Sequence, residues 1–99
     1  MQPAGSLVPK LLRDLGLERE FLGWRAVEEW TEVVGPRIAR RTRAVGFHNG
    51  VLRVEVEGSA WRYELGFLER RVIQELERRL GAPCVRKLQF VQAHGGIRG

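Results

Sequence analysis

The chain has 99 residues and a mass of 11.3 kDa, with 43% hydrophobic and 29% charged residues. This composition excludes a wholly disordered chain, and the short length leaves little room for a large internal cofactor cavity. The sequence contains no apolar run long enough to span a membrane, residues 1–10 show no secretory signal, and the lone Cys84 cannot form an internal disulfide. We therefore expect one cytoplasmic domain over residues 1–99 without membrane contact, with an ordered core at about 6–92 and a flexible tail at 93–99.

The charge is strongly basic and unevenly distributed along the chain. Lys and Arg number 17 against 12 Asp and Glu, which gives a formal net charge of +5, and all but two of the cations are arginine. Residues 1–36 carry a net negative charge, whereas residues 37–62 hold six arginines and two glutamates. This asymmetry predicts one basic surface rather than a uniformly charged shell, and the planar guanidinium suits phosphate groups.

The first 41 residues predict three helices. A short amphipathic helix is capped by Ser6 and ended by Gly16. Apolar residues at three- and four-residue spacing predict a second helix over residues 20–34. Gly35-Pro36 ends the second helix and begins a short third one. The apolar stripe of the second helix is expected in the core and consists of Phe21, Trp24, Val27, Trp30 and Val34.

After Thr42 the hydrophobic period changes from helical to alternating. Asn49-Gly50 predicts a hairpin of strands at 43–48 and 51–57, because both positions of its tight turn require positive φ. An uninterrupted register pairs His48 with Val51, Phe47 with Leu52 and Val45 with Val54. In that register the buried face consists of Phe47, Val45, Leu52, Val54 and Val56, and the outer face carries Arg53, Glu55 and Glu57.

A long helix is predicted from Ser59, its cap, to Leu80, with Gly81 as its stop, and a last strand follows at about residues 85–92. The fold class is therefore α+β in the order α-α-(short α)-β-β-α-β, a three-stranded sheet with helices packed on one face. The sequence leaves open whether the last strand pairs with the first or the second. The side chains expected to face the core from the long helix and the last strand are Trp61, Leu65, Leu68, Val72, Leu76, Leu80, Leu88 and Phe90.

Side chains that could support catalysis or bind a metal are few and scattered. His48 lies beside the hairpin turn and His94 in the tail, and neither has a Ser, Cys or carboxylate partner at motif spacing. Cys84 is expected to be a small half-buried residue rather than a nucleophile. The Gly-x-x-Gly at residues 96–99 has no helix after it, so it does not predict a phosphate-binding turn. We expect no enzymatic activity, no cofactor and no metal site.

Six arginines are the candidates for contact with the phosphates of nucleic acid: Arg37, Arg40, Arg41, Arg43, Arg53 and Arg62. The first three fall on one face of a helical turn, and we expect no nearby acidic residue to neutralise them. A surface of this kind binds nucleic acid by releasing counterions, so its affinity falls steeply with salt. A merely soluble basic surface is the alternative. The three tryptophans are expected in the core rather than as platforms on which bases stack: Trp24, Trp30 and Trp61.

Four blocks of the sequence resemble the DciA family of bacterial proteins, formerly a domain of unknown function. They are WTEVVGPRIA at 30–39, NGVLRVEV at 49–56, SAWRYEL at 59–65 and VRKLQF at 85–90, in the family's order. The resemblance implies a nonenzymatic KH-like domain without a nucleotide site. It also implies binding to the replicative helicase DnaB, help in loading that helicase onto single-stranded DNA, and DNA binding by the protein itself.

Many members of the family add a flexible extension that contributes to helicase and DNA contact, whereas this sequence ends soon after Val91. We expect a minimal member of the family, or one whose partner role is narrower or changed. The usual KH loop with Gly-x-x-Gly between two helices is missing, so nucleic-acid binding is expected to use a basic surface. Two other hypotheses stay open: a KH-like RNA-binding module, and a structural interaction domain such as a homodimer.

Overall fold

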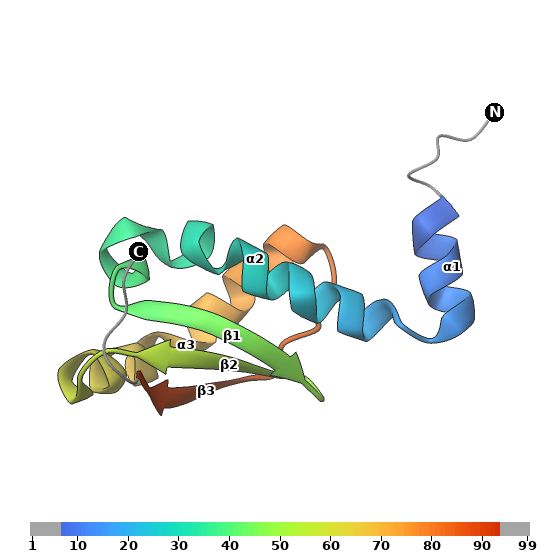
Figure 1. Cartoon of the computed structure of the whole chain (residues 1–99). Helices are drawn as coiled ribbons and strands as arrows, with labels where there is room; N and C mark the ends of the chain where they lie inside the picture. The colour runs from blue at the N-terminus through green and yellow to red at the C-terminus, as the bar shows by residue number, and fades with distance from the viewer. Residues whose placement is uncertain (1–6, 94–99) are drawn as a thin grey trace.

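The computed structural model describes residues 7–93, and it describes side chains from Lys10 onward. Ser6, His94 and the Gly-x-x-Gly at 96–99 lie outside the described residues, as does the predicted tail beyond Ala93. Both long helices, α2 and α3, pack on the same face of a three-stranded sheet (Figure 1), which confirms the predicted α+β fold class. The elements are α1 (Leu7–Leu15), α2 (Glu18–Ala39), β1 (Thr42–His48), β2 (Val51–Val56), α3 (Ser59–Leu80) and β3 (Lys87–Gln92).

The predicted break at Gly35-Pro36 is a kink inside α2. Gly35 has φ 83° and ψ 167°, a conformation that glycine adopts readily because it has no Cβ. Pro36 follows, and its fixed φ suits the first turn of the helical segment beyond the kink. The two helices expected on either side of the break are therefore the two arms of α2, and the second arm carries Arg37.

The buried face of α2 differs from the predicted apolar stripe. It centres on Gly23 and Trp30, whereas Trp24 is 57% exposed and Phe21 is exposed as well, so the prediction that these two lie in the core was wrong. A Cβ on Gly23 would lie only 1.9 Å from Cδ1 of Phe47, so the backbone of α2 packs directly on this ring of β1. Trp24 is one position further along, about 100° around the helix, and therefore points away from the sheet.

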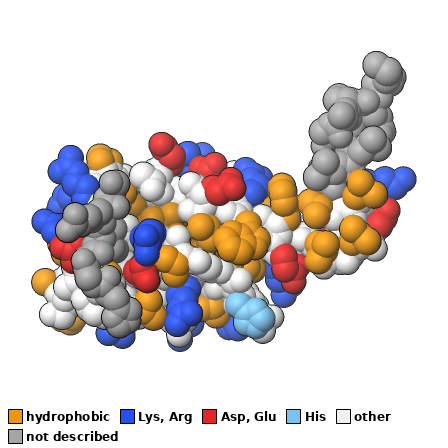
Figure 2. Space-filling view, in the orientation of Figure 1, with side chains coloured by type: hydrophobic (Ala, Val, Ile, Leu, Met, Phe, Trp, Pro, Cys, Tyr) orange, Lys and Arg blue, Asp and Glu red, His pale blue; other side chains and the backbone are white. Residues whose placement is uncertain are grey.

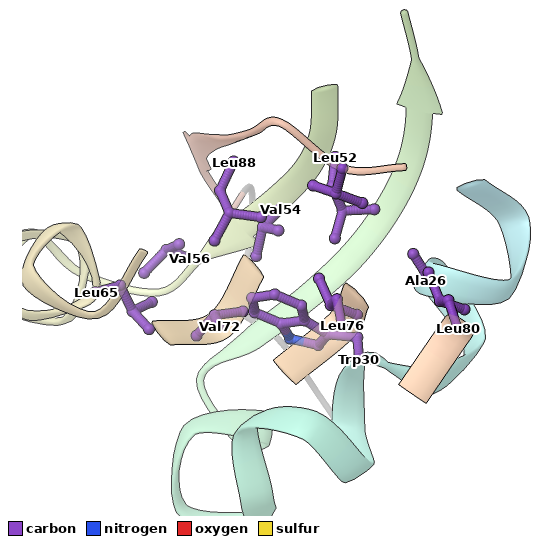
Figure 3. Close-up of a cluster of buried hydrophobic side chains, with 11 residues drawn as sticks. Ala26, Trp30, Leu52, Val54, Val56, Leu65, Val72, Leu76, Leu80 and Leu88 are labelled. Carbon is purple, nitrogen blue, oxygen red and sulfur yellow. The ribbon is translucent and has the colours of Figure 1, made fainter. Parts of the chain in front are cut away.

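Trp30 lies at the centre of the core and is only 2% exposed (Figure 3). Its Nε1–H donates to Oγ1 of the buried Thr42 at 2.9 Å, and that hydroxyl donates to the carbonyl oxygen of Ile38, also at 2.9 Å. Both polar groups are thereby satisfied away from water. The remaining members of the buried cluster are Ala26, Leu52, Val54, Val56, Leu65, Val72, Leu76, Leu80, Val85 and Leu88. Trp61, Leu68 and Phe90 are half-buried against this cluster.

The sheet has the order β1-β2-β3, with β2 antiparallel to β1 and parallel to β3. This order answers the question that the sequence left open, because the last strand pairs with the second. The hairpin turn forms as predicted, since Asn49 and Gly50 both have positive φ, at 50° and 81°. The helices cover one face of the sheet, and the other face is not covered by any helix of the described residues (Figure 1).

A bulge in β1 shifts the predicted hairpin register by one residue. The two pairs nearest the turn form as predicted, but beyond the bulge Ala44 rather than Val45 opposes Val54. The prediction that Val45 lies on the buried face was therefore wrong, and its side chain is exposed. An unbroken alternation from Phe47 would also have placed Arg43 toward the core. The extra residue of the bulge turns Arg43 to the outer face instead, which avoids burial of an unpaired charge.

The start of α3 also differs from the prediction. Gly58 occupies the N-cap position and no side chain caps the helix, so Ser59 is its first residue rather than its cap. Gly81 ends the helix as predicted, with a left-handed φ of 79°. Near this end Arg79 Nε lies 3.0 Å from Glu29 Oε2, and this ion pair joins α3 to α2.

Candidate nucleic-acid interface

Three of the six candidate arginines form ion pairs with glutamates from distant parts of the sequence. The N–O distances are 3.6 Å for Arg37–Glu64, 2.9 Å for Arg41–Glu57 and 2.7 Å for Arg43–Glu55. Acidic residues are far from these arginines along the chain but close to them in space. The expectation that no carboxylate neutralises this segment was therefore wrong.

The hairpin register explains two of these pairs. The bulge in β1 places Arg43 directly opposite Glu55 on the outer face of the sheet. One step beyond, the backbone N–H of Glu57 donates to the carbonyl oxygen of Arg41 at 2.8 Å, which brings their side chains together. Opposite charges that face each other across two strands attract, so the shifted register itself produces the pairing.

The third pair lies where α2 and α3 meet. The guanidinium carbon of Arg37 is 5.2 Å from the ring centroid of Trp61, which is a cation–π distance, and the same guanidinium contacts Glu64 of α3. Exposed ion pairs of this kind contribute only about 0–1 kcal/mol each. The side chains of these arginines are 77%, 51% and 62% exposed, so the three guanidinium groups remain accessible although each lies beside a carboxylate.

The other three candidates, Arg40, Arg53 and Arg62, have no carboxylate within ion-pair distance among the residues that the structure describes. Arg53 shares the outer sheet face with Arg43. Arg62 lies on α3 two positions before Glu64, about 200° around the helix, and therefore on a different side from the Arg37 pair. The six arginines therefore do not form one cluster: Arg43 and Arg53 share the outer sheet face, Arg37 lies where α2 and α3 meet, and Arg62 lies on another side of α3. On the side of the molecule that Figure 2 shows, acidic side chains lie beside basic ones.

An open groove crosses the outer face of the sheet near the hairpin. Gly46 opposes Arg53 and has no atom within 4 Å of the place where a Cβ would be, so the groove is open above this arginine. Arg86, which the sequence reasoning missed, donates from Nε to the carbonyl oxygen of Asn49 at 3.1 Å and joins the groove. The groove is lined by Val45, Gly46, Phe47, His48, Asn49, Val51, Arg53, Arg86 and Gln89.

Two aromatic residues that the sequence reasoning also missed stand on the outer side of α3. Tyr63 is 73% and Phe67 is 71% exposed, and their ring centroids are 5.0 Å apart. A sequence signal for this pair existed, because the predicted buried stripe of the helix leaves both positions on the opposite side.

The end of the molecule formed by α1 and the start of α2 is rich in exposed apolar side chains. Among the described elements α1 contacts only α2, and it stands away from the sheet (Figure 1). Hydrophobic side chains gather at this end in the space-filling view (Figure 2). Apolar patches of this kind are typical of sites of protein–protein contact. The exposed residues are Leu11, Leu15, Leu17, Phe21 and Trp24.

The titratable groups of the described residues do not converge on one centre. Cys84 is half-buried and lies 3.8 Å from the carbonyl oxygen of Arg19, and burial raises the pKa of its thiol. His48 is exposed, with Nε2 3.1 Å from the side-chain amide of Asn49. Within residues 10–93, no three His, Cys, Asp or Glu side chains are placed to hold a metal ion. None of the described helices is both long and apolar enough to cross a membrane.

These observations define a class of protein: a small α+β domain with accessible arginines, an exposed aromatic pair and an apolar end. The chain belongs to the DciA family, because the sequence model described as "Dna[CI] antecedent, DciA" matches residues 3–90. This match confirms the family resemblance of the four sequence blocks.

Several curated relatives that the chain matches carry the name UPF0232 protein. The chain is similar to the UPF0232 protein of Mycobacterium leprae (strain TN), with 28% identity over 89 residues that cover 90% of this chain and 47% of the relative. The protein of Mycolicibacterium paratuberculosis is 30% identical, over 90% of this chain and 49% of that protein. The protein of Rhodococcus jostii is 25% identical, over 90% and 47%. The chain therefore spans about half the length of the curated relatives that it matches.

Proposed function

We propose that this chain is a nonenzymatic DNA-replication accessory protein that acts in the cytoplasm. It binds single-stranded DNA and the replicative helicase DnaB, and it assists the loading of that helicase. The observation that carries the proposal is the match to the DciA family over residues 3–90. The accessible arginines support the nucleic-acid part, and the apolar end supports the part that concerns a protein partner.

The phosphate contacts come from the six arginines in two different ways. Within the described part of the chain, Arg40, Arg53 and Arg62 have no carboxylate to displace, and they take phosphates directly. The other three exchange a glutamate for a phosphate oxygen, which costs little because each of their ion pairs is exposed to solvent. Arg37, Arg41 and Arg43, which are paired, therefore contribute less to the affinity for nucleic acid than the three unpaired arginines.

A titration of end-labelled single-stranded DNA at two or more salt concentrations tests this part of the proposal. Removal of one cation that binds a phosphate lowers the slope of log affinity against log salt by about 0.7. We expect a reduced slope for Arg53→Ala with Arg62→Ala, and a smaller reduction for Arg37→Ala with Arg41→Ala. Arg78→Ala is the matched control, because Arg78 already pairs with Glu75 on its own helix. Absence of binding at low salt would contradict the DNA assignment.

A pull-down with purified DnaB from the same organism tests the partner separately. Trp24→Ala removes the most bulky exposed side chain of the apolar end, so it should weaken DnaB capture. Tyr63→Ala removes an exposed aromatic ring from another surface and serves as the control. If wild-type protein captures no DnaB, the helicase part of the proposal is wrong whatever the DNA titration shows.

The same purified protein serves to test the two alternative functions, an RNA-binding module and a homodimeric interaction domain. An RNA of equal sequence, titrated beside the DNA, tests the RNA-binding module. The mass of the protein in solution, measured by light scattering, tests the homodimer. Preference for RNA, or tight self-association without any nucleic-acid affinity, would favour the respective alternative over the replication role.

A further inference from the structure

Tyr63 and Phe67 form an exposed aromatic pair whose purpose the fold does not explain. The two residues are one helical turn apart on α3, and their rings meet edge to face at 5.0 Å with an interplanar angle of 84°. Neither side chain belongs to the buried core or to the half-buried residues around it. Two large aromatic side chains that remain more than 70% exposed contribute little to the stability of the fold.

Two shallow grooves meet at this pair. Phe67 and Gly66 line both of them, and no atom lies within 4 Å of the place where a Cβ of Gly66 would be, so the helix surface between the grooves is open. The first groove is lined by Ser59, Arg62, Tyr63, Gly66 and Phe67. The second runs toward β3 and is lined by Gly66, Phe67, Glu69, Arg70, Ile73, Gln74 and Arg86.

The charge around the pair favours an anionic ligand. Arg62, Arg70 and Arg86 line the two grooves, and none of them has a carboxylate within ion-pair distance among the described residues. Glu69 is the one acidic residue in the lining, and its Oε2 accepts a hydrogen bond from the backbone N–H of Leu88 at 2.8 Å. That carboxylate is therefore engaged by the edge of β3, and the three guanidinium groups retain their charge.

The grooves of α3 continue onto the uncovered face of the sheet. Arg86 lines the second α3 groove and also the groove near the hairpin that contains Arg53. The three open grooves therefore form one continuous path, because each shares lining residues with the next, and the aromatic pair lies on this path. The path has arginines at both ends and along its length, which are Arg53, Arg86, Arg70 and Arg62.

We propose that Tyr63 and Phe67 are the platform on which bases of single-stranded nucleic acid stack, while Arg62, Arg70 and Arg86 hold the adjacent phosphates. This inference rests on the proposed function, because it assigns a site to its nucleic-acid binding. Exposed aromatic rings beside a basic groove are the general means by which proteins bind single strands without reading their sequence.

The site favours a single strand over a duplex, because the exposed rings offer faces on which unpaired bases can stack. In a duplex the base faces are already stacked on one another, so an aromatic pair on a convex helix surface gains nothing from them. An unpaired strand exposes its base faces and carries a phosphate beside each one. DNA and RNA share this chemistry, so both enter the experiment as separate arms.

The test measures the affinity of end-labelled single strands and of the corresponding duplex by fluorescence anisotropy, with a full salt series. Tyr63→Ala combined with Phe67→Ala removes both rings and should weaken single-strand binding by roughly fivefold or more for each base that stacks. The salt slope should stay unchanged, because both substitutions leave every cation in place. Tyr63→Phe combined with Phe67→Tyr retains both rings and should bind like the wild type.

Two further variants make the outcome specific. Arg62→Ala with Arg70→Ala should lower the salt slope by about 0.7 for each phosphate that is no longer bound. Arg78→Ala removes a cation of α3 that already pairs with Glu75 and should bind DNA like the wild type, with the same salt slope. The thermal unfolding of each variant should match that of the wild type, since all these side chains are exposed.

The results separate this inference from the proposed function. If the wild type binds no single strand, the nucleic-acid part of the proposed function fails. If the wild type binds and the variant without rings binds equally well, or loses duplex and single-strand affinity alike, the stacking site is wrong and the proposed function stands. Tighter binding of RNA than of DNA would support the stacking site and count against a role in DNA replication.

Discussion

Replacement of Gly23 by alanine is a direct test of how α2 packs on the sheet. A new Cβ at this position would lie 1.9 Å from Cδ1, 2.2 Å from Cγ and 2.5 Å from Cε1 of Phe47. Carbon atoms in contact are about 3.5–4.0 Å apart, so the ring must move by more than about 1 Å. Cγ lies on the axis about which the ring rotates, so rotation of the ring leaves the short distance to Cγ unchanged.

Two opposing terms determine the size of the effect. Alanine is better than glycine inside a helix by about 1 kcal/mol. Displacement of Phe47 from a packed position costs about 1–3 kcal/mol. We expect Gly23→Ala to lower the free energy of unfolding by about 1 kcal/mol, as the difference of these terms. Gly66→Ala supplies the control, because Gly66 also lies inside a helix but has nothing within 4 Å of its new Cβ. It should raise the free energy of unfolding by about 0.5–1 kcal/mol.

Urea denaturation followed by circular dichroism measures both variants. In a Phe47→Ala background the ring is absent, and there Gly23→Ala should raise the free energy of unfolding as much as Gly66→Ala does. If Gly23→Ala stabilises the wild-type protein as much as Gly66→Ala does, the close approach of α2 to β1 is wrong. The same result would remove the explanation for the exposure of Trp24.

Three further predictions concern the buried hydrogen bonds, the ion pairs and the cysteine. Thr42→Val leaves the buried Nε1–H of Trp30 without an acceptor and should lower the free energy of unfolding by about 1–3 kcal/mol. Thr42→Ser keeps the hydroxyl and serves as the control. If urea denaturation shows the same loss of unfolding free energy for both variants, the hydrogen bond is contradicted. Glu55→Gln removes the partner of Arg43 and should make the salt slope of DNA binding steeper by up to about 0.7; an unchanged slope would exclude Arg43 from the interface. Burial, opposed by the charge of Arg19, raises the pKa of Cys84, so alkylation of the folded protein should require higher pH than alkylation of the urea-unfolded chain. Because the unfolded chain loses the thiol proton at lower pH, the contribution of this cysteine to stability is present below its unfolded-state pKa and declines as pH rises toward the folded-state pKa. If the pH midpoint of alkylation of the folded protein is at or below that of the unfolded chain, the thiol is not buried.

Features that depend on a few neighbouring residues could be predicted from the sequence. The Asn49-Gly50 turn, the kink at Gly35 and the stop at Gly81 each follow from the need for positive φ, which is a local property of the backbone. The buried stripe of α3 also follows from its helical spacing. The order of elements could be predicted largely for the same reason, since Gly16, Asn49-Gly50, Gly58 and Gly81 mark every boundary except the one between α2 and β1.

Features that depend on contacts between distant segments could not be predicted in this way. The spacing of apolar residues in α2 fits two faces, and the choice between them depends on Gly23 meeting Phe47 across the interface with the sheet. The bulge at Val45 has no local signal in an otherwise regular alternation. Both errors arise because spacing indicates that a face is buried, whereas close packing decides which residues lie at its centre.

The charge of the candidate site shows the same dependence on distant contacts. The sequence segment richest in arginine gives three of its cations to glutamates, and the shifted register of β1 produces two of those ion pairs. Apart from Arg40, the unpaired arginines that line the grooves come from β2, from α3 and from the segment before β3, and those of the two α3 grooves flank exposed aromatic rings. A polyanion responds to the charge that is available in space rather than to the charge counted along the chain. A strand that follows this path would therefore contact residues that no single basic segment contains, and removal of Arg86 should weaken its binding more than removal of Arg41, which is already paired.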